Sequence, residues 1–384
     1  MASKKQLYLD YNATTPVDLR VVDAMLPYFT EKFGNASSDH VFGWDAGEVV
    51  EQAREQIAGL LNCKPTGITF TSGATEAANL ALFGFCERNK HKGNHIITCK
   101  TEHKAILDPM KALERNGFEV TYLEVDPEGN IDLKELEQAM ISRTILVCLI
   151  LANNETGLIH PMSAIEKIVH SKDVKLMSDI TQAVGKIPVN LNELNLDLAI
   201  FSSHKIYGPK GAGALYINKN NKVDINPYVF GGGQEKGMRP GTMNVPGIVG
   251  FGKAAEIAFS ELEDEAARIL KLRNKLESGL KNIDGAIINS ENCNRLPNTT
   301  NISFENIEGS VLLRKMNSLA ISRGSACTSN TIEASHVLKA MGLSDDLALS
   351  SFRISLGRDT SMEDIDFAVK EITKTVNQLK RAMV

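Results

Sequence analysis

Residues 197–217 read DLAIFSSHKIYGPKGAGALYI, two apolar runs joined by a loop rich in glycine and hydroxyl side chains. The runs at 197–202 and 214–217 are short and mostly apolar, which is typical of strands that are buried on both faces. Comparable runs precede them at residues 67–71, 95–99, 119–125, 144–152 and 174–178. Helical patterns separate these runs, so the sequence predicts an α/β fold with a mostly parallel central sheet covered by helices.

The alternation of strand-like and helical patterns ends after residue 256. We expect one long charged helix at residues 257–282, several shorter segments, and a last amphipathic helix after Ser361. With 384 residues, the chain is long enough to bury two cores. The sequence therefore predicts a large domain of residues 14–256 and a smaller α+β domain made of residues 1–13 and 257–384.

Composition argues against several classes of function. The chain has 42 Lys and Arg against 47 Asp and Glu and shows no basic patch, so we expect no nucleic-acid partner. The longest apolar run, at 144–152, is far shorter than the ~20 residues of a membrane helix, and no run of signal-peptide length opens the chain. The six cysteines contain no CxxC pair, which argues against a disulfide framework and a zinc ribbon. We expect a cytoplasmic protein without membrane contact.

The first candidate site is the stretch TSGATE at residues 71–76, between an expected strand and an expected helix. Small residues and hydroxyls at a helix N-terminus expose backbone N–H groups to an anion, which suits a phosphate. Taken alone, the same pattern is more typical of an ordinary capped turn. The stretch therefore becomes a stronger candidate for a phosphate site only if other cofactor-binding groups lie beside it in the fold.

Lys205 is the second candidate, because it follows an apolar strand and is flanked by hydroxyls and a glycine loop. A lysine in such a place can lose its hydration and form a Schiff base with an aldehyde cofactor. Asp179 ends another expected strand of the same sheet. Pyridoxal 5'-phosphate (PLP) needs a lysine, a phosphate cradle and a carboxylate for its ring nitrogen, and all three types of group follow strands here.

A metal site is the competing interpretation for four side chains spaced by four residues: His91, His95, Cys99 and His103. On one continuous helix they would align as metal ligands. Gly93 interrupts any such helix, and residues 95–99 read as a strand, in which neighbouring side chains alternate between faces. We therefore expect no metal.

Eight blocks of the chain, taken in order, carry a strong resemblance. They are LYLDYNATTPVD (7–18), SGATEAANLAL (72–82), TEHKAILD (101–108), ANNETG (152–157), SDITQAVGKIPVNL (178–191), SSHKIYGPKGAGALY (202–216), GGGQEKGMRPGTMNV (231–245) and RGSACTSN (323–330). Together they resemble the signatures of cysteine desulfurases of the NifS and IscS type, which belong to the class V aminotransferase family and have the PLP-dependent fold type I. The blocks span nearly the whole chain, so the joint match is specific.

The resemblance implies three catalytic residues. Lys205 would bind the cofactor covalently, His103 would stack on its ring and move protons, and Cys327 would be the nucleophile that receives sulfur. From the residues alone, Cys327 is a weaker candidate: it lies in a run of small polar residues, where a thiol can be accessible. The other cysteines read as structural, Cys148 within an apolar strand among them.

The resemblance also implies which residues bind the cofactor and the substrate. Asp179 would pair with the ring nitrogen and Gln182 with the ring hydroxyl, and Arg353, helped by Asn154, would clamp the substrate carboxylate. Phosphate would be bound by Ala74, Thr75, Ser202 and His204, and by Thr242 of a second subunit, which implies a homodimer. Ile180 departs from the family pattern, in which a small residue that packs against the ring usually follows the aspartate.

The sequence therefore predicts an L-cysteine desulfurase that forms L-alanine and a persulfide on Cys327. The sulfur would pass to an iron-sulfur scaffold or another acceptor protein, for iron-sulfur cluster assembly or thiolation. Two alternatives stay open: a selenocysteine lyase or another PLP lyase, and a non-catalytic sulfur-relay protein. The presence of Lys205, Asp179 and His103 together argues against the relay protein.

Overall fold

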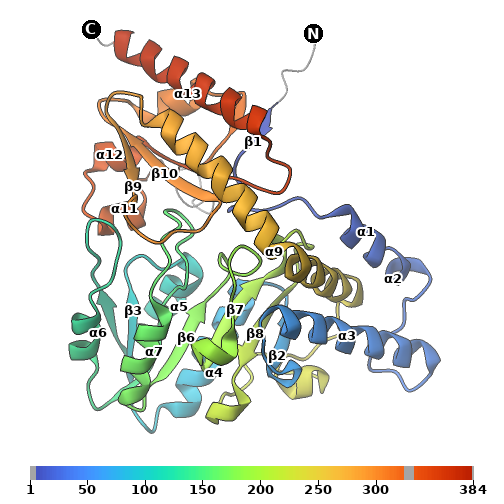
Figure 1. The fold of residues 1–384 in the computed structure, drawn as a ribbon. Helices are drawn as coiled ribbons and strands as arrows, with labels where there is room; N and C mark the ends of the chain where they lie inside the picture. The colour runs from blue at the N-terminus through green and yellow to red at the C-terminus, as the bar shows by residue number, and fades with distance from the viewer. Residues whose placement is uncertain (1–5, 324–332, 383–384) are drawn as a thin grey trace.

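A seven-stranded sheet forms the centre of the larger part of the molecule (Figure 1). The computed structural model describes residues 6–323 and 333–382, so Cys327 lies outside the described residues. In order across the sheet, the strands are β2 (Ile68–Thr71), β8 (Gly213–Ile217), β7 (Leu198–Ser202), β6 (Lys175–Asp179), β5 (Thr144–Cys148), β3 (His95–Cys99) and β4 (Glu119–Leu123). Only β8 runs antiparallel to its neighbours, which confirms the expected mostly parallel sheet.

Helices cover both faces of this sheet, as the apolar strands require. Neighbouring strand residues belong to different hydrophobic clusters: Ile96 and Ile97 point to opposite faces of β3. Helices α4 (Ala74–Asn89) and α5 (Lys104–Arg115) pack on one face. The opposite face is covered by α3 (Val41–Leu60), α6 (Leu133–Ala139), α7 (Met162–Ser171), α8 (Leu191–Leu194) and the first half of α9 (Val245–Leu280). Strands buried on both faces explain why their sequences read as uninterrupted apolar runs.

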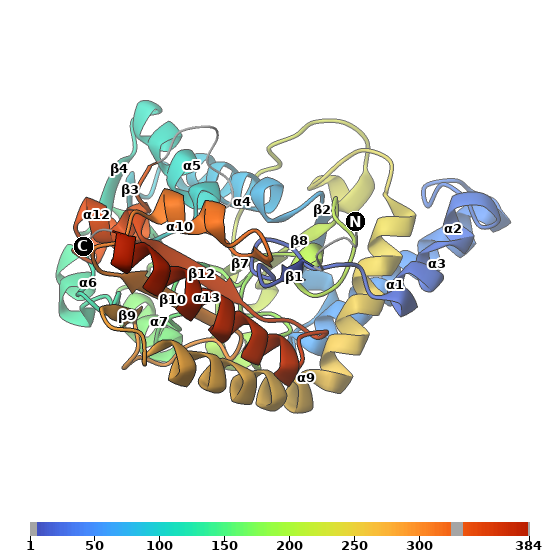
Figure 2. The ribbon, with the colours of Figure 1, turned by 90° about the horizontal axis from the view of Figure 1, so that it is seen from above.

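The smaller part of the molecule has its own sheet and its own hydrophobic core (Figure 2). Its antiparallel strands are β9 (Ala286–Asn289), β10 (Thr299–Phe304) and β12 (Ser351–Ser355), in the order β12-β10-β9. The short strand β1 (Leu7–Tyr8) pairs with β11 (Leu319–Ala320). The helices are the second half of α9, α10 (Gly309–Lys315), α11 (His336–Ala340), α12 (Asp345–Leu349) and α13 (Met362–Ala382). The N-terminal strand therefore lies with C-terminal segments that are more than 300 residues away in sequence.

Helix α9 connects the two parts and begins twelve residues before the expected start at residue 257 (Figure 1). It is continuous across the boundary that the sequence placed between residues 256 and 257. Glycines in its first half read as helix breakers, but they allow close packing instead. A Cβ at Gly252 would lie 2.6 Å from the Cα of Ala53 in α3, and a Cβ at Gly250 would lie 2.5 Å from the sulfur of Met25 in α1 (Leu19–Met25). None of the helices within residues 6–323 and 333–382 has the length and apolar character to cross a membrane.

Candidate active site

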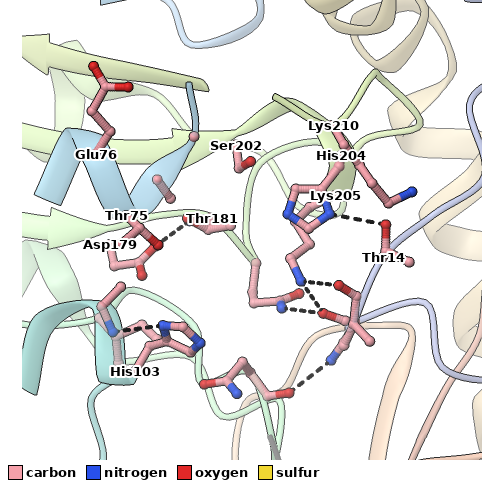
Figure 3. Close-up of a pocket in the computed structure, with 18 of the residues that line it drawn as sticks. Thr14, Thr75, Glu76, His103, Asp179, Thr181, Ser202, His204, Lys205 and Lys210 are labelled. Atoms are coloured by element: carbon pink, nitrogen blue, oxygen red, sulfur yellow. Dashed lines mark hydrogen bonds between the residues drawn. The ribbon is translucent and has the colours of Figure 1, made fainter. Parts of the chain in front are cut away.

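A cavity of about 490 Å³ lies at the carboxyl ends of the strands, where parallel sheets place their ligands. Strands β2, β6 and β7 end at or beside residues that line it (Figure 3). Ten of the twelve site residues expected from the sequence line this cavity: Ala74, Thr75, His103, Asn154, Asp179, Gln182, Ser202, His204, Lys205 and Arg353. The fold thus brings together side chains from segments that span residues 74 to 353.

Lys205 reaches the cavity from a short turn, Ser203–Lys205, directly after β7. Its Nζ donates hydrogen bonds to two backbone carbonyls, the oxygen of Asn12 at 2.5 Å and the oxygen of Ala13 at 2.6 Å (Figure 3). Both acceptors belong to the segment that follows β1, so the N-terminal segment holds the amine of Lys205 in the cavity. A lysine held at a strand end by neutral carbonyls is suited to covalent attachment of an aldehyde cofactor.

Asp179 is the last residue of β6 and is only 4% exposed. Its Oδ1 accepts a hydrogen bond from the backbone N–H of Thr181 at 2.9 Å. Within the described parts of the chain, no lysine, arginine or histidine forms an ion pair with this carboxylate. Because a buried carboxylate favours a cationic partner, Asp179 fits a protonated pyridine nitrogen.

The start of helix α4 has the features that the TSGATE stretch predicts for an anion site. Its N-cap, Gly73, has no side chain that could accept from the helix, so the first-turn N–H groups at Ala74 and Thr75 have no capping oxygen. A Cβ at Gly213 would lie 2.5 Å from the Cα of Gly73, so glycine allows β8 to approach this turn closely. The N–H groups and the helix dipole favour a phosphate here.

His204 faces the same region from the opposite side, after β7. Burial first, and then the positive charges of Lys205, Lys210 and Lys186, lower the pKa of its ring to about 4. The ring is therefore neutral near pH 7, with Nδ1 3.1 Å from the hydroxyl oxygen of Thr14. A neutral imidazole can still donate one hydrogen bond to a phosphate oxygen.

His103 caps the N-terminus of α5, and its Nδ1 accepts a hydrogen bond from the backbone N–H of Ala105 at 3.1 Å (Figure 3). Since Nδ1 is an acceptor, the neutral ring carries its proton on Nε2. His103 also lines the cavity. The backbone of α5 thus fixes which nitrogen can give a proton to a ligand.

Arg353 lies in β12 of the smaller part and is 2% exposed. Its Nη2 donates to Oδ1 of Asp10 at 2.7 Å, and its Nη1 donates to the backbone oxygen of Asn154 at 3.0 Å. Within the described residues, the Nε of Arg353 and the Oδ1 of Asn154 are buried polar atoms without a partner. A guanidinium held by two contacts, with hydrogen-bonding capacity left over, suits a ligand that brings a carboxylate.

Taken together, these groups fit PLP. A lysine, a buried carboxylate without a cation and an uncapped helix N-terminus line one cavity, and each matches one part of the cofactor: its aldehyde, its ring nitrogen and its phosphate. Lys205, Asp179 and the residues around Ala74 would hold those three parts.

Of the two remaining expected residues, Thr242 does not line the cavity and is exposed on the surface of this chain. The other, Cys327, lies outside the described residues. Ile180, which departs from the family pattern, is fully buried in the core and does not line the cavity. Alternation along the extended chain explains this, because Asp179 and Thr181 point one way and Ile180 the other. Thr181 is the residue that lines the cavity.

Sequence reasoning missed residues that act through tertiary contacts. Asn12 and Lys186 lie within blocks that carry the resemblance, but neither was assigned a role. The structure joins Asn12 to Lys205 through a backbone carbonyl and to Lys186 through a side chain. His95 was one of the four candidate metal ligands. In the structure, its two ring nitrogens form hydrogen bonds with the hydroxyls of Thr144 and Thr121 inside the sheet.

The chain matches known proteins over nearly its full length. A family model described as Aminotransferase class-V covers residues 7–367. The cysteine desulfurase IscS of Anaeromyxobacter sp. (strain Fw109-5) is 49% identical over 379 residues, which cover 98% of this chain and 94% of that protein. A solved NifS-like protein superposes with a TM-score of 0.91 at 42% identity and covers 97% of this chain and 100% of its own. A structure of SspA in complex with cysteine gives a TM-score of 0.82 at 35% identity and covers 91% of this chain and 98% of its own.

These matches agree with the fold. All twelve expected site residues, Cys327 included, fall by their position in the sequence within the matched residues 7–367. With a family match of this extent, the chain belongs to the PLP-dependent class V aminotransferase family and, within it, to the cysteine desulfurases.

Proposed function

We propose that this protein converts L-cysteine to L-alanine and holds the released sulfur as a persulfide on Cys327. The observation that carries the proposal is a single cavity lined by Lys205, Asp179, His103 and Arg353. An amine, a carboxylate, an imidazole and a guanidinium are the groups needed to hold an amino acid beside PLP and to move its α-proton.

Each of these residues has a different role in the proposed reaction. When bound, PLP acts as an electron sink for the negative charge that develops at the α-carbon of the substrate. Asp179 supplies the negative charge that keeps the ring nitrogen protonated. Lys205 takes the α-proton as general base, and the Nε2 proton of His103 is positioned to be given to the product.

Cys327 receives the sulfur. Its thiolate attacks the sulfur of L-cysteine, so that an S–S bond forms and the C–S bond breaks. The electron pair of the broken bond remains on the β-carbon, which takes up a proton and becomes the methyl group of L-alanine. The reaction balances with a persulfide as the sulfur product, and it needs no external oxidant or reductant.

Described residues on both sides of Cys327 support its access to the cavity. Ser322 pairs through its backbone with Arg353, which lines the cavity. On the other side, the Nε2 of His336 lies 2.9 Å from the carbonyl oxygen of Glu102, the residue before His103. Cys327 is the fourth residue after Arg323, and four residues span at most about 14 Å when extended. The chain is therefore anchored beside the cavity at both ends of this short segment.

Arg353 provides a test of substrate binding. The Arg353→Lys variant should raise the KM for L-cysteine, because a single ammonium replaces a planar group that can hold a carboxylate by two hydrogen bonds. The loss expected for a hydrogen bond to a charge is about 1.5–3 kcal/mol, or roughly a tenfold to hundredfold rise in KM. The visible absorption of bound PLP should persist in this variant. A KM equal to that of the wild type would exclude Arg353 from substrate binding.

We further propose that the active protein is a homodimer in which Thr242 completes the site of the partner. Helices α1, α2 (Pro27–Thr30) and α3 lie together at one side of the molecule (Figure 1). Large apolar side chains on or next to them are exposed and make up an apolar patch: Leu19, Leu26, Phe29, Phe33, Val41, Phe42 and Trp44. The loop that carries Thr242 lies beside it, since Gln234 bonds both to Ser37 and to the backbone of Gly241. Large exposed apolar patches mark protein–protein interfaces.

Charge placed in this patch should separate the subunits. In light scattering coupled to gel filtration, we expect the wild type to have twice the mass of one chain. The Phe29→Asp/Phe42→Asp double variant should have the mass of one chain, because buried carboxylates without partners strongly disfavour an interface. An exposed substitution on another face, Lys167→Asp on α7, serves as the control. A wild-type monomer that forms alanine at full rate would contradict the dimer.

The sulfur acceptor is proposed to be a protein, such as a scaffold for iron-sulfur cluster assembly or an enzyme of thiolation, because a persulfide transfers its outer sulfur readily to another thiolate. The five described cysteines are all unbridged. Free thiols fit a reducing compartment, and we propose a cytoplasmic location.

One experiment tests the proposed function directly. The purified protein is loaded with PLP and given L-cysteine, and alanine, sulfide and the mass of the Cys327 peptide are measured. We expect alanine, with sulfide released when a reductant is present, and a peptide heavier by one sulfur atom. Activity on L-selenocysteine but not on L-cysteine would favour a selenocysteine lyase, and binding of PLP without any product would favour the sulfur-relay protein.

A further inference from the structure

A buried lysine that the proposed chemistry does not use lies directly behind the cavity. Lys186 follows the turn after β6, and its backbone N–H donates to the carbonyl of Ala183 at 3.0 Å. Gly185 makes this turn possible: its φ is 69°, and a Cβ there would lie 2.7 Å from the Cγ2 of Ile206. Lys186 as a residue is partly exposed, but its amino group is buried. The turn therefore directs the amine inward, behind Gln182.

A short chain of hydrogen bonds connects Lys186 to the catalytic lysine. The Nζ of Lys186 donates to Oε1 of Gln182 at 2.5 Å and to Oδ1 of Asn12 at 3.3 Å. Gln182 in turn donates from Nε2 to the backbone oxygen of Asn12 at 3.0 Å. The same oxygen accepts the 2.5 Å hydrogen bond from the Nζ of Lys205. Asn12 therefore accepts from both lysines: its side-chain oxygen from Lys186 and its backbone oxygen from Lys205.

These contacts fix the orientation of the Gln182 amide. The carbonyl of Asn12 can only accept, so the NH₂ group of Gln182 must face it. The amide oxygen then faces Lys186, which donates to it. An amide turned the other way would bring two carbonyl oxygens together and leave the amine of Lys186 without this acceptor. Because Lys186 donates to Oε1 and Asn12 accepts from one N–H, the second N–H of Gln182 is the group of this amide that is left for a ligand in the cavity that Gln182 lines.

A contribution to the stability of the fold does not explain why the amine of Lys186 is buried. Among the described residues, no carboxylate forms an ion pair with it, and the charged groups that act on it are Lys205 and Arg353, both positive. Burial first, and then these two charges, hold its pKa well below the ordinary range of a lysine. A buried amine without a counter-charge costs free energy of folding. Costs of this kind are typical of functional sites.

We infer that Lys186 is a positioning residue that fixes the orientation of the Gln182 amide by donating to its Oε1, which leaves an N–H group of Gln182 for a ligand in the cavity. The inference rests on the proposed function and on the expectation, implied by the resemblance, that Gln182 bonds the hydroxyl of the PLP ring. It extends that function by one residue, which acts through others and touches neither PLP nor L-cysteine.

The Lys186→Met variant tests the inference, because methionine keeps the apolar stem and removes every N–H donor. Loss of one well-placed hydrogen bond corresponds to roughly a fivefold to tenfold effect. We expect the Kd of the apoprotein for PLP to rise by about that factor, and the visible absorption band of bound PLP to shift. The value of kcat should fall, while the KM for L-cysteine, which depends on Arg353, should change less than about twofold. Lys186→Arg keeps N–H donors and should recover most of the PLP affinity.

The temperature of unfolding distinguishes positioning from a structural role. Removing a buried amine that has no counter-charge should leave the midpoint of unfolding unchanged or higher. An unfolded or clearly less stable Lys186→Met protein would show that Lys186 is structural, and it would overturn the inference.

A double-mutant cycle tests whether Lys186 acts through Gln182. In a Gln182→Ala background, Lys186→Met should change the Kd for PLP by less than about twofold, because the partner that it orients is already absent. Additive effects would contradict the inference, as would an unchanged Kd and spectrum in Lys186→Met. These readouts are independent of turnover: a wild type that binds PLP but forms no alanine would contradict the proposed function and leave the test of Lys186 intact.

Discussion

Replacing Lys205 with alanine is expected to stop the formation of alanine from L-cysteine and to leave the protein unable to bind PLP covalently. Lys205 is the lysine that two backbone carbonyls, of Asn12 and Ala13, hold in the cavity. A positioned general base contributes about 10²–10⁴-fold to a rate, and here the same side chain also anchors the cofactor. We therefore expect a loss at the upper end of this range, measured as the initial rate of alanine formation.

Covalent attachment is measured separately from turnover. Borohydride reduction of the PLP-loaded wild type should fix the mass of PLP on the peptide that contains Lys205, and on no peptide of the Lys205→Ala variant. Lys167→Ala, an exposed lysine on α7, is the matched control and should keep both the label and the rate. A label on Lys104, Lys186 or Lys210 would overturn the assignment of Lys205.

Most strands of the large sheet were predictable because they are buried on both faces; the edge strand β4 is the exception. The run at 95–99 matches β3 residue for residue, and the run at 197–202 differs from β7 by one residue. The run at 144–152 was too long, since β5 ends at Cys148. The residues after it are equally buried, and burial alone does not tell a strand from the buried loop that follows it.

The start of α9 was not predictable from local pattern. Residues 245–252 contain one proline and three glycines, which usually end helices. Pro246 lies in the first turn, where a helix loses no hydrogen bond to it, and the glycines allow the backbone to approach α1 and α3. The advantage of glycine at these positions comes from neighbours that are distant in sequence.

The residues of the candidate site also fall into those that could be predicted from the sequence and those that could not. Residues that follow strands, such as Asp179 and Lys205, could be found because a parallel sheet gathers the carboxyl ends of its strands. Arg353 came from the resemblance alone, since it lies on a strand of the smaller part. Asn12 could not be found by residue type, because its part at Lys205 is made by a backbone carbonyl that every residue has.

The assignment of sulfur transfer to Cys327 gains support from the other five cysteines. Burial raises the pKa of the Cys63 thiol to about 12 and that of Cys99 to about 11, and it also raises the pKa of Cys86, Cys148 and Cys293. These thiols are protonated near pH 7, and a protonated thiol is a poor nucleophile. Three of them, Cys86, Cys99 and Cys148, are buried in the sheet and α4, as their sequence context indicated. Among the six cysteines, Cys327 is therefore the one that this argument does not exclude.

The Cys327→Ser variant should separate proton transfer from sulfur transfer. Lys205, Asp179 and His103 are intact, so the variant should bind PLP, and its spectrum should change when L-cysteine is added. Cleavage of the C–S bond requires a soft thiolate, whereas a serine hydroxyl stays protonated and has little affinity for divalent sulfur. The rate of alanine formation from L-cysteine should then fall to that of a protein-free control, and no peptide should gain a sulfur atom.

The choice of control and of a second substrate makes the result of Cys327→Ser decisive. Cys293→Ser should keep the wild-type rate, because Cys293 lies among the polar groups of Asn130 and Glu128, which a serine hydroxyl can also contact. L-selenocysteine should still lose selenium in Cys327→Ser, since selenide is a better leaving group than sulfide; because selenide takes the bonding electron pair with it, the products would be pyruvate and ammonia and not alanine. If Cys327→Ser instead formed alanine from L-cysteine at the wild-type rate, with an added reductant releasing the sulfur as sulfide, the sulfur would leave without the Cys327 thiolate. The protein would then be a lyase of the selenocysteine type, and the persulfide on Cys327 would have no place in its reaction.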